Sequence, residues 1–180
     1  MNRTINHILI VLSTSFILVS CTDGASLQRY FVDHQESKDF ITQDVPISML
    51  KIDESKFNNE QKEAYNSVKR LNFLGFKANE INDESLKVEL AKVKTILSNK
   101  KYNDLVEFSD RGNKVVVKYI GTDEEADEVV VFGTSKEMGF GIVRVLGDDM
   151  SPDKMVTLVS ILQSANVEEA QVQDIMNFFK

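Results

Sequence analysis

The 180-residue sequence has one cysteine, two histidines and fewer basic than acidic residues. A single cysteine cannot form an internal disulfide, so burial and hydrogen bonding must stabilise the fold. After the N-terminal leader only His34 is left as a nitrogen ligand, which argues against the usual zinc sites. Because 21 basic residues face 28 acidic ones, the chain lacks the basic surface that nucleic-acid binding requires.

The sequence also lacks a long apolar run. Residues 8–18 are mostly apolar, but three hydroxyl residues interrupt them, and a transmembrane helix needs about 20 apolar residues. With Arg3 ahead of it, this run is typical of a secretory signal peptide. The run ends in a sequence that looks like a bacterial lipobox, namely Leu18, Val19, Ser20 and Cys21. We therefore predict cleavage before Cys21 and lipidation of its thiol, the alternative being a leftover cysteine in an ordinary signal peptide.

These features predict three parts of the chain: a lipoprotein signal peptide over 1–20, a lipidated tether over 21–26 and a single α+β domain over 27–180. Removal of the leader removes Arg3 and no acidic residue, which leaves 20 basic against 28 acidic residues and a net charge of −8. A polybasic membrane anchor is therefore not expected. Acyl chains on Cys21 must hold the protein at the membrane.

Helical patterns occur at both ends of the predicted domain. Ser26 can cap a helix that runs to His34, and Asn58 or Asn59 can cap another. The clearest helix has one apolar stripe, formed by Leu86, Leu90, Val93 and Leu97. Ser151 followed by Pro152 is a strong helix start. A last helix is expected from Asn166, with an apolar stripe of Val172, Ile175, Met176 and Phe179; the position of Phe178 stays open.

Strand patterns fill the middle of the domain. Residues 40–45 and 71–76 are two candidates, and four more follow at short spacing over 105–108, 115–120, 129–132 and 140–146. The short turns between these four leave no room for crossover helices, so they predict an antiparallel meander in the C-terminal half. We therefore expect an α+β fold with a mostly antiparallel sheet and helices packed on one face.

Three segments form a recognisable set: the run from Ser26 to Glu36 just after the lipobox, the run from Val129 to Gly133, and the run from Val143 to Met150. Together they resemble small lipoproteins of the Bacteroidota. The lipoproteins form a family of unknown function, and the resemblance covers essentially the whole mature chain. It implies a place in the cell envelope and supplies no catalytic residue.

The densest charge run is a candidate acidic interaction loop, formed by Asp123, Glu124, Glu125, Asp127 and Glu128. It lacks the mid-loop glycine and the closing glutamate of a calcium-binding EF-hand. We expect a solvated loop between strands, because blocks of like charge usually stay in water. No metal site is predicted, although docking of a basic partner and binding of a divalent ion are the alternatives.

Other candidates for catalysis have simpler structural interpretations. His34 can complete the apolar face of its helix, and no nucleophile pattern accompanies it. Asp148 and Asp149 are adjacent, so as turn residues they point apart instead of flanking a substrate. Gly139 and Gly141 lack the lysine and hydroxyl residue of a phosphate-binding loop. We therefore predict no catalytic residue, no cofactor and no enzyme activity.

The sequence predicts a lipid-anchored protein of the cell envelope with a binding, sensing or scaffolding role. Its partners would be the membrane, through the lipid on Cys21, and an envelope protein. The alternatives are a carboxylate or divalent-metal-dependent enzyme and a self-assembling structural protein. Because Thr22, not an aspartate, follows Cys21, we expect the periplasmic face of the outer membrane, with surface display as the other option.

Overall fold

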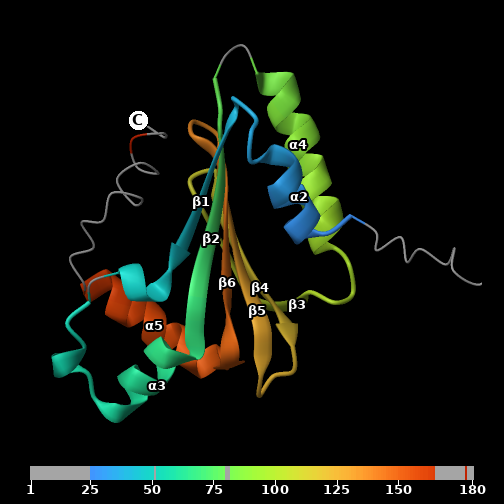
Figure 1. Ribbon diagram of the computed structural model, residues 1–180. Coiled ribbons are helices and arrows are strands. Elements are labelled where there is room, and N and C mark those ends of the chain that lie inside the picture. The colour runs from blue at the N-terminus through green and yellow to red at the C-terminus, as the bar shows by residue number, and fades with distance from the viewer. Residues whose placement is uncertain (1–24, 51, 80–81, 165–176, 178–180) are drawn as a thin grey trace, which may run out of the picture.

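The computed structural model describes residues 25–50, 52–79, 82–164 and 177 (Figure 1). Its strands are β1 (Phe40–Pro46), β2 (Val68–Lys77), β3 (Asn103–Asp110), β4 (Asn113–Gly121), β5 (Ala126–Ser135) and β6 (Gly139–Met150). Its α-helices are α2 (Leu27–His34), α3 (Asn59–Ser67), α4 (Asp83–Leu97) and α5 (Pro152–Ser164), and two single 3-10 turns, η2 (Ile47–Met49) and η3 (Glu54–Lys56), join β1 to α3. None of the helices in this described part is long and apolar enough to cross a membrane.

The helices start where the sequence offers a cap. The backbone N–H of Arg29 donates to Ser26 Oγ at 3.3 Å at the start of α2. Asn58 and Gln61 form a reciprocal capping box at the start of α3, with bonds of 2.8 and 3.0 Å. Ser151 Oγ accepts from the backbone N–H of Lys154 at 3.3 Å, and Pro152 is the first residue of α5. These three predicted starts are confirmed.

The six strands form one antiparallel sheet in the order β1-β2-β6-β5-β4-β3. Strands β3 to β6 are sequential neighbours, so the predicted C-terminal meander is confirmed. The hairpin between β3 and β4 turns through Arg111 and Gly112, which both have positive φ, as a two-residue hairpin loop of type I′ requires. The α+β class and the antiparallel sheet are confirmed.

The helices cover both faces of the sheet, whereas the sequence led us to expect one face. One buried cluster joins α2 and α4 to Val130, Phe132 and Ile142. A second cluster joins α3 and α5 to Val129 and Val145. Since successive residues of a strand point to opposite faces, these two clusters lie on opposite sides of the sheet. Strands β5 and β6 are apolar on both sides, so each side needs its own helices.

The two helix pairs lie at opposite ends of the sheet as well as on opposite faces (Figure 1). The pair α2 and α4 packs over Phe76 and Phe140, near the end of β2 and the start of β6. The pair α3 and α5 packs over Val68 and Val145, at the other end of these strands. This diagonal arrangement leaves half of each face uncovered by the helices of the described residues.

Candidate functional site

The predicted lipidation site lies outside the described residues. Leu18, Val19, Ser20 and Cys21 all precede residue 25, where the description begins. The structure places the start of α2 at Leu27, so only residues 22–26 separate Cys21 from the folded domain. Lipidation of Cys21 therefore stays a prediction, and its consequence would be a domain held close to the bilayer.

The structure divides the predicted acidic loop into two parts. Asp123, Glu124 and Glu125 lie exposed in the connection between β4 and β5, and the Tyr119 hydroxyl donates to Asp123. Asp127 is exposed on β5. Glu128 does not belong to the exposed loop, because β5 has begun at Ala126 and its alternation turns Glu128 inward. Across the described ranges, no group of three or more histidine, cysteine or carboxylate side chains is arranged to hold a metal ion.

Glu128 instead forms a buried ion pair with Arg144 on β6. Arg144 Nε and Nη2 donate to the two carboxylate oxygens at 2.7 and 2.8 Å, a bidentate geometry. The side chains are only 10% and 11% exposed, and the Arg144 guanidinium lies 5.5 Å from the centre of the Phe31 ring. This pair joins the sheet to α2, and each charge depends on the other because a buried unpaired charge is costly.

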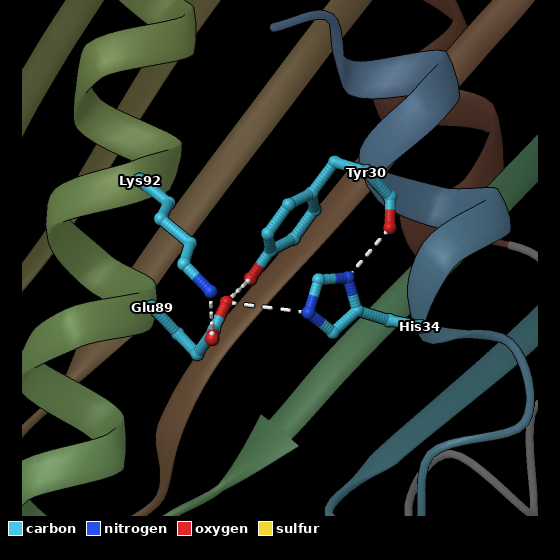
Figure 2. Close-up of polar contacts among 4 residues, drawn as sticks. All are labelled: Tyr30, His34, Glu89 and Lys92. Atoms are coloured by element: carbon cyan, nitrogen blue, oxygen red, sulfur yellow. Dashed lines mark hydrogen bonds and ion pairs between the residues drawn. The ribbon is translucent and has the colours of Figure 1, made fainter.

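A second polar cluster joins α2 to α4 through Glu89 (Figure 2). The Tyr30 hydroxyl donates to Glu89 Oε2 at 2.7 Å, and Lys92 Nζ lies 2.7 Å from Oε1. His34 Nε2 lies 3.3 Å from Oε2. Burial opposes ionisation of Glu89, but the hydrogen bonds from Lys92 and Tyr30 outweigh it and lower the pKa of Glu89. Burial and the bond to Glu89 raise the pKa of Tyr30.

The geometry around His34 favours a structural role. Its Nδ1 lies 2.7 Å from the Tyr30 carbonyl oxygen, and because a carbonyl only accepts, Nδ1 carries a proton. Its Nε2 faces Glu89, so both ring nitrogens already contact protein oxygens. The ring also packs between Tyr30 and Phe40, with centroid distances of 4.2 and 4.3 Å. A general base needs a nitrogen directed at a substrate, and His34 offers neither of its two.

The other sequence candidates also have structural partners. Asp148 contacts Lys69, whereas Asp149 binds Lys154 Nζ at 2.6 Å, so the two adjacent carboxylates do not act as a pair. Phe140, between Gly139 and Gly141, is buried in the core beside α2 and α4. The burial of Phe140 agrees with the strand interpretation made from the sequence, whereas Asp148 and Asp149, expected in a turn, lie in the last part of β6.

The half of the α3–α5 face that none of the described helices covers is apolar, and we call it the open half-face. Two rows of cross-strand neighbours form it. One row runs from Val106 through Val117 and Val131 to Val143 and Phe73. The other runs from Phe108 through Val115, Gly133, Gly141 and Gly75 to Ile41. Phe108 is 55% exposed and Val106 is 48% exposed, both on the edge strand β3.

Three glycines sit side by side in the second row, and we call them the glycine row: Gly75, Gly141 and Gly133. A Cβ added at Gly133 would meet no atom within 4 Å, so the space above it is open. A Cβ at Gly141 would lie 3.3 Å from the Phe73 ring. The Phe73 ring therefore leans over Gly141, whereas the backbone at Gly133 is open, so another element can approach closely there.

The helix-free half of the opposite face is polar. It forms a groove of about 720 Å³ beside α2, lined among others by Arg70, Asn72 and Asp44. Asp44 accepts from Asn72 at 2.9 Å and lies 3.3 Å from Arg70. Water forms hydrogen bonds with these polar groups, whereas contact of water with the exposed Val106 and Phe108 of the open half-face is unfavourable. Of the two helix-free halves, the apolar one is the better candidate for a binding surface.

Sequence reasoning did not identify the open half-face. The signal was present in two unbroken valine runs, over 115–117 on β4 and 129–131 on β5. Such runs place apolar side chains on both faces of a strand. The runs show that both faces of the sheet must be buried by helices. They do not show which half of a face stays uncovered, because that depends on where the helices pack.

The sequence model of one protein family, described as Domain of unknown function (DUF4252), matches residues 30–158. The match spans every strand and the described helices except the two ends, α2 and α5, which it covers in part. Comparisons with curated proteins and with solved structures give no significant match.

Proposed function

Because the chain belongs to the DUF4252 family of domains of unknown function, we propose a function from its own surface: it is a lipid-anchored, non-catalytic module that binds an envelope protein through the open half-face. The observation that carries this proposal is the exposure of Phe108 and Val106 on an apolar sheet surface. Contiguous apolar surface on an otherwise charged domain is typical of protein interaction sites.

The position of the tether supports this use of the surface. Residues 22–26 lead into α2, which packs on the opposite face of the sheet. A lipid on Cys21 would therefore attach on the side away from the open half-face. That arrangement leaves the apolar surface free for a protein partner while the anchor holds the domain at the membrane.

The edge strand gives the partner a second means of attachment. Among the described strands, β3 pairs with β4 on one side only, and most of its residues are exposed. Unpaired backbone groups along an edge can bind an added strand. Self-assembly through the same edge is the second candidate function, and the experiment below separates the two.

The test is photo-crosslinking in cells of a lipidated protein with a photoreactive residue in place of Phe108. Ser109 is the matched control position, because it lies on the same strand but points to the opposite face. We expect one envelope protein to be captured at position 108, not at 109, and to be lost when Cys21→Ser removes the anchor. Equal capture at both positions, or none, would contradict the proposal, and capture of a second copy would favour self-assembly.

A further inference from the structure

We propose that the partner adds an antiparallel strand to the outer side of β3, and that this strand alternates apolar with polar residues and ends in lysine or arginine beside the β4–β5 connection. The inference rests on the proposed function and names the chemistry of its partner. The helix expected from Asn166 lies outside the described residues, apart from residue 177, and takes no part in it.

Strand β3 can accept a further strand along its outer side. It pairs with β4 and has no second neighbour among the described strands. Its eight residues extend about 26 Å, which is enough for a partner strand of ordinary length. The side chains from Asp104 to Asp110 are all exposed. In strand addition, backbone hydrogen bonds supply affinity and alternate side chains supply specificity.

The exposed side chains of β3 determine the alternation that a partner needs. Val106 and Phe108 share the open half-face with Val117 and Val115 of β4. Directly opposed residues of neighbouring strands point to the same face and contact each other. Apolar partner residues beside Val106 and Phe108 would therefore continue the two apolar rows. The residues between them would point to the opposite face, where polar side chains remain in water.

The charge on β3 disfavours a second copy of the chain as the added strand. Strand β3 contains Asp104, Glu107 and Asp110 and no basic residue. Lys118 and Lys114 of β4 lie 2.6 Å from Asp104 and Glu107, so these cations are already bound within the sheet. Two β3 strands side by side would bring like charges together, which is destabilising. A partner strand without carboxylates avoids this repulsion.

The β4–β5 connection lies at the start of β3. Asn103 is the cross-strand partner of Tyr119, and its side-chain amide donates to the Gly121 carbonyl oxygen at 3.1 Å. The Tyr119 hydroxyl donates to Asp123 in the connection. Because Tyr119 belongs to the buried cluster of the α3–α5 face, Asp123 lies on the same side of the sheet as the open half-face.

The carboxylates of this connection lack counter-charges. Asp123, Glu124, Glu125 and Asp127 are exposed, and none forms an ion pair with a lysine or arginine of the described ranges. The start of β3 is three residues, about 10 Å, from Val106. A strand that runs along β3 therefore brings its end beside these carboxylates. Lysine or arginine there would speed association, most strongly at low salt.

The test uses two peptides with amidated C-termini that differ only at their C-terminal end. Both alternate valine and threonine, and one ends in two lysines whereas the other ends in two glutamates. In an antiparallel pair this end lies beside the β4–β5 connection. Each peptide is titrated into the isotope-labelled, unanchored Cys21→Ser protein. We expect the backbone NMR signals of β3 to shift, and the lysine peptide to bind about tenfold more tightly than the glutamate peptide at low salt.

Neutralising the connection provides the matched comparison. Glu124→Gln and Glu125→Gln are combined in one variant, and Glu36→Gln and Asp39→Asn in the control. All four residues are exposed, and both variants change the net charge by the same amount, but the control residues lie between α2 and β1. We expect the first variant to reduce the preference for the lysine peptide severalfold and the control to retain it.

Equal affinity for the two peptides would overturn the inference, and so would binding of neither peptide or shifts confined to the other edge strand, β1. An equal loss of preference in both variants would assign it to net charge and would also overturn it. Capture of an envelope protein at position 108 with equal peptide affinities would leave the proposed function standing. A lysine preference without any captured partner would count against the proposed function alone.

Discussion

At the scale of single residues, two buried polar contacts join α2 to the rest of the domain. Glu128 on β5 and Arg144 on β6 pair diagonally across the two strands, and Arg144 also faces Phe31 on α2. Tyr30 and His34 of the same helix meet Glu89 on α4. Water reaches these polar groups poorly, so each group needs its protein partner for hydrogen bonding or charge compensation. When a substitution removes one group, the cost comes mainly from the remaining group, which stays buried without its partner.

Arg144→Met should lower the free energy of unfolding by about 3–5 kcal/mol, because it leaves the Glu128 carboxylate buried without a counter-charge. The measurement is urea unfolding at neutral pH. Arg70→Met is the matched control, since the Arg70–Asp44 pair is about half exposed and such pairs contribute about 0–1 kcal/mol. Adding Glu128→Gln to Arg144→Met should restore part of the loss. If Arg144→Met and Arg70→Met lower the free energy of unfolding equally, burial of the Glu128–Arg144 pair does not increase its importance for stability.

Glu89→Gln should make the stability less dependent on pH. The pKa of Glu89 is lower in the folded protein than in the unfolded chain, where a glutamate has a pKa of about 4.3. Ionised Glu89 therefore stabilises the fold above that pH, and this contribution is lost as pH falls through the lowered pKa. The wild type should exceed Glu89→Gln in Tm at pH 7, and the gap should shrink toward pH 3. A gap that stays constant over this range contradicts the assignment.

At the scale of elements, local sequence signals determine where helices begin. Helix α3 is short and has few apolar contacts of its own, with Ala64 and Tyr65 as its buried apolar residues. Its start depends on the capping box between Asn58 and Gln61. A short helix is marginal without such a cap, because its first N–H groups lack partners.

Asn58→Ala should destabilise the protein by about 1 kcal/mol, since the side chain that accepts from the Gln61 N–H is removed. Asn58→Asp keeps an accepting oxygen and should be nearly neutral. Chemical unfolding of the three proteins side by side measures the difference. If Asn58→Asp is as damaging as Asn58→Ala, the hydrogen bond is not the source of the effect.

The sequence was sufficient to predict most elements because their signals are local. Periodicity and turn residues located the four strands of the meander, and caps located α2, α3 and α5. The placement of helices on both faces could not be predicted in this way. It depends on contacts such as Tyr30 with Glu89, which are 59 residues apart in the sequence. Glu128 was assigned to the acidic loop for the same reason, because its partner Arg144 is visible only once β5 and β6 pair.

At the scale of the whole molecule, the diagonal arrangement of the helix pairs explains why two helix-free surfaces exist. The one beside α2 contains polar residues and can face water. The one above α5 contains the glycine row, half-buried valines, and the exposed Val106 and Phe108. The account assigns the second surface to protein binding.

The most direct test is the affinity of the partner captured at position 108 for three purified proteins: the wild type, Phe108→Ser and Ser109→Ala. A large aromatic side chain at the centre of a contact often contributes more than 1.4 kcal/mol, which corresponds to a tenfold change in Kd. The account predicts that Phe108→Ser weakens binding tenfold or more, while Ser109→Ala leaves the Kd unchanged. Equal affinity of all three proteins would contradict the open half-face as the binding surface.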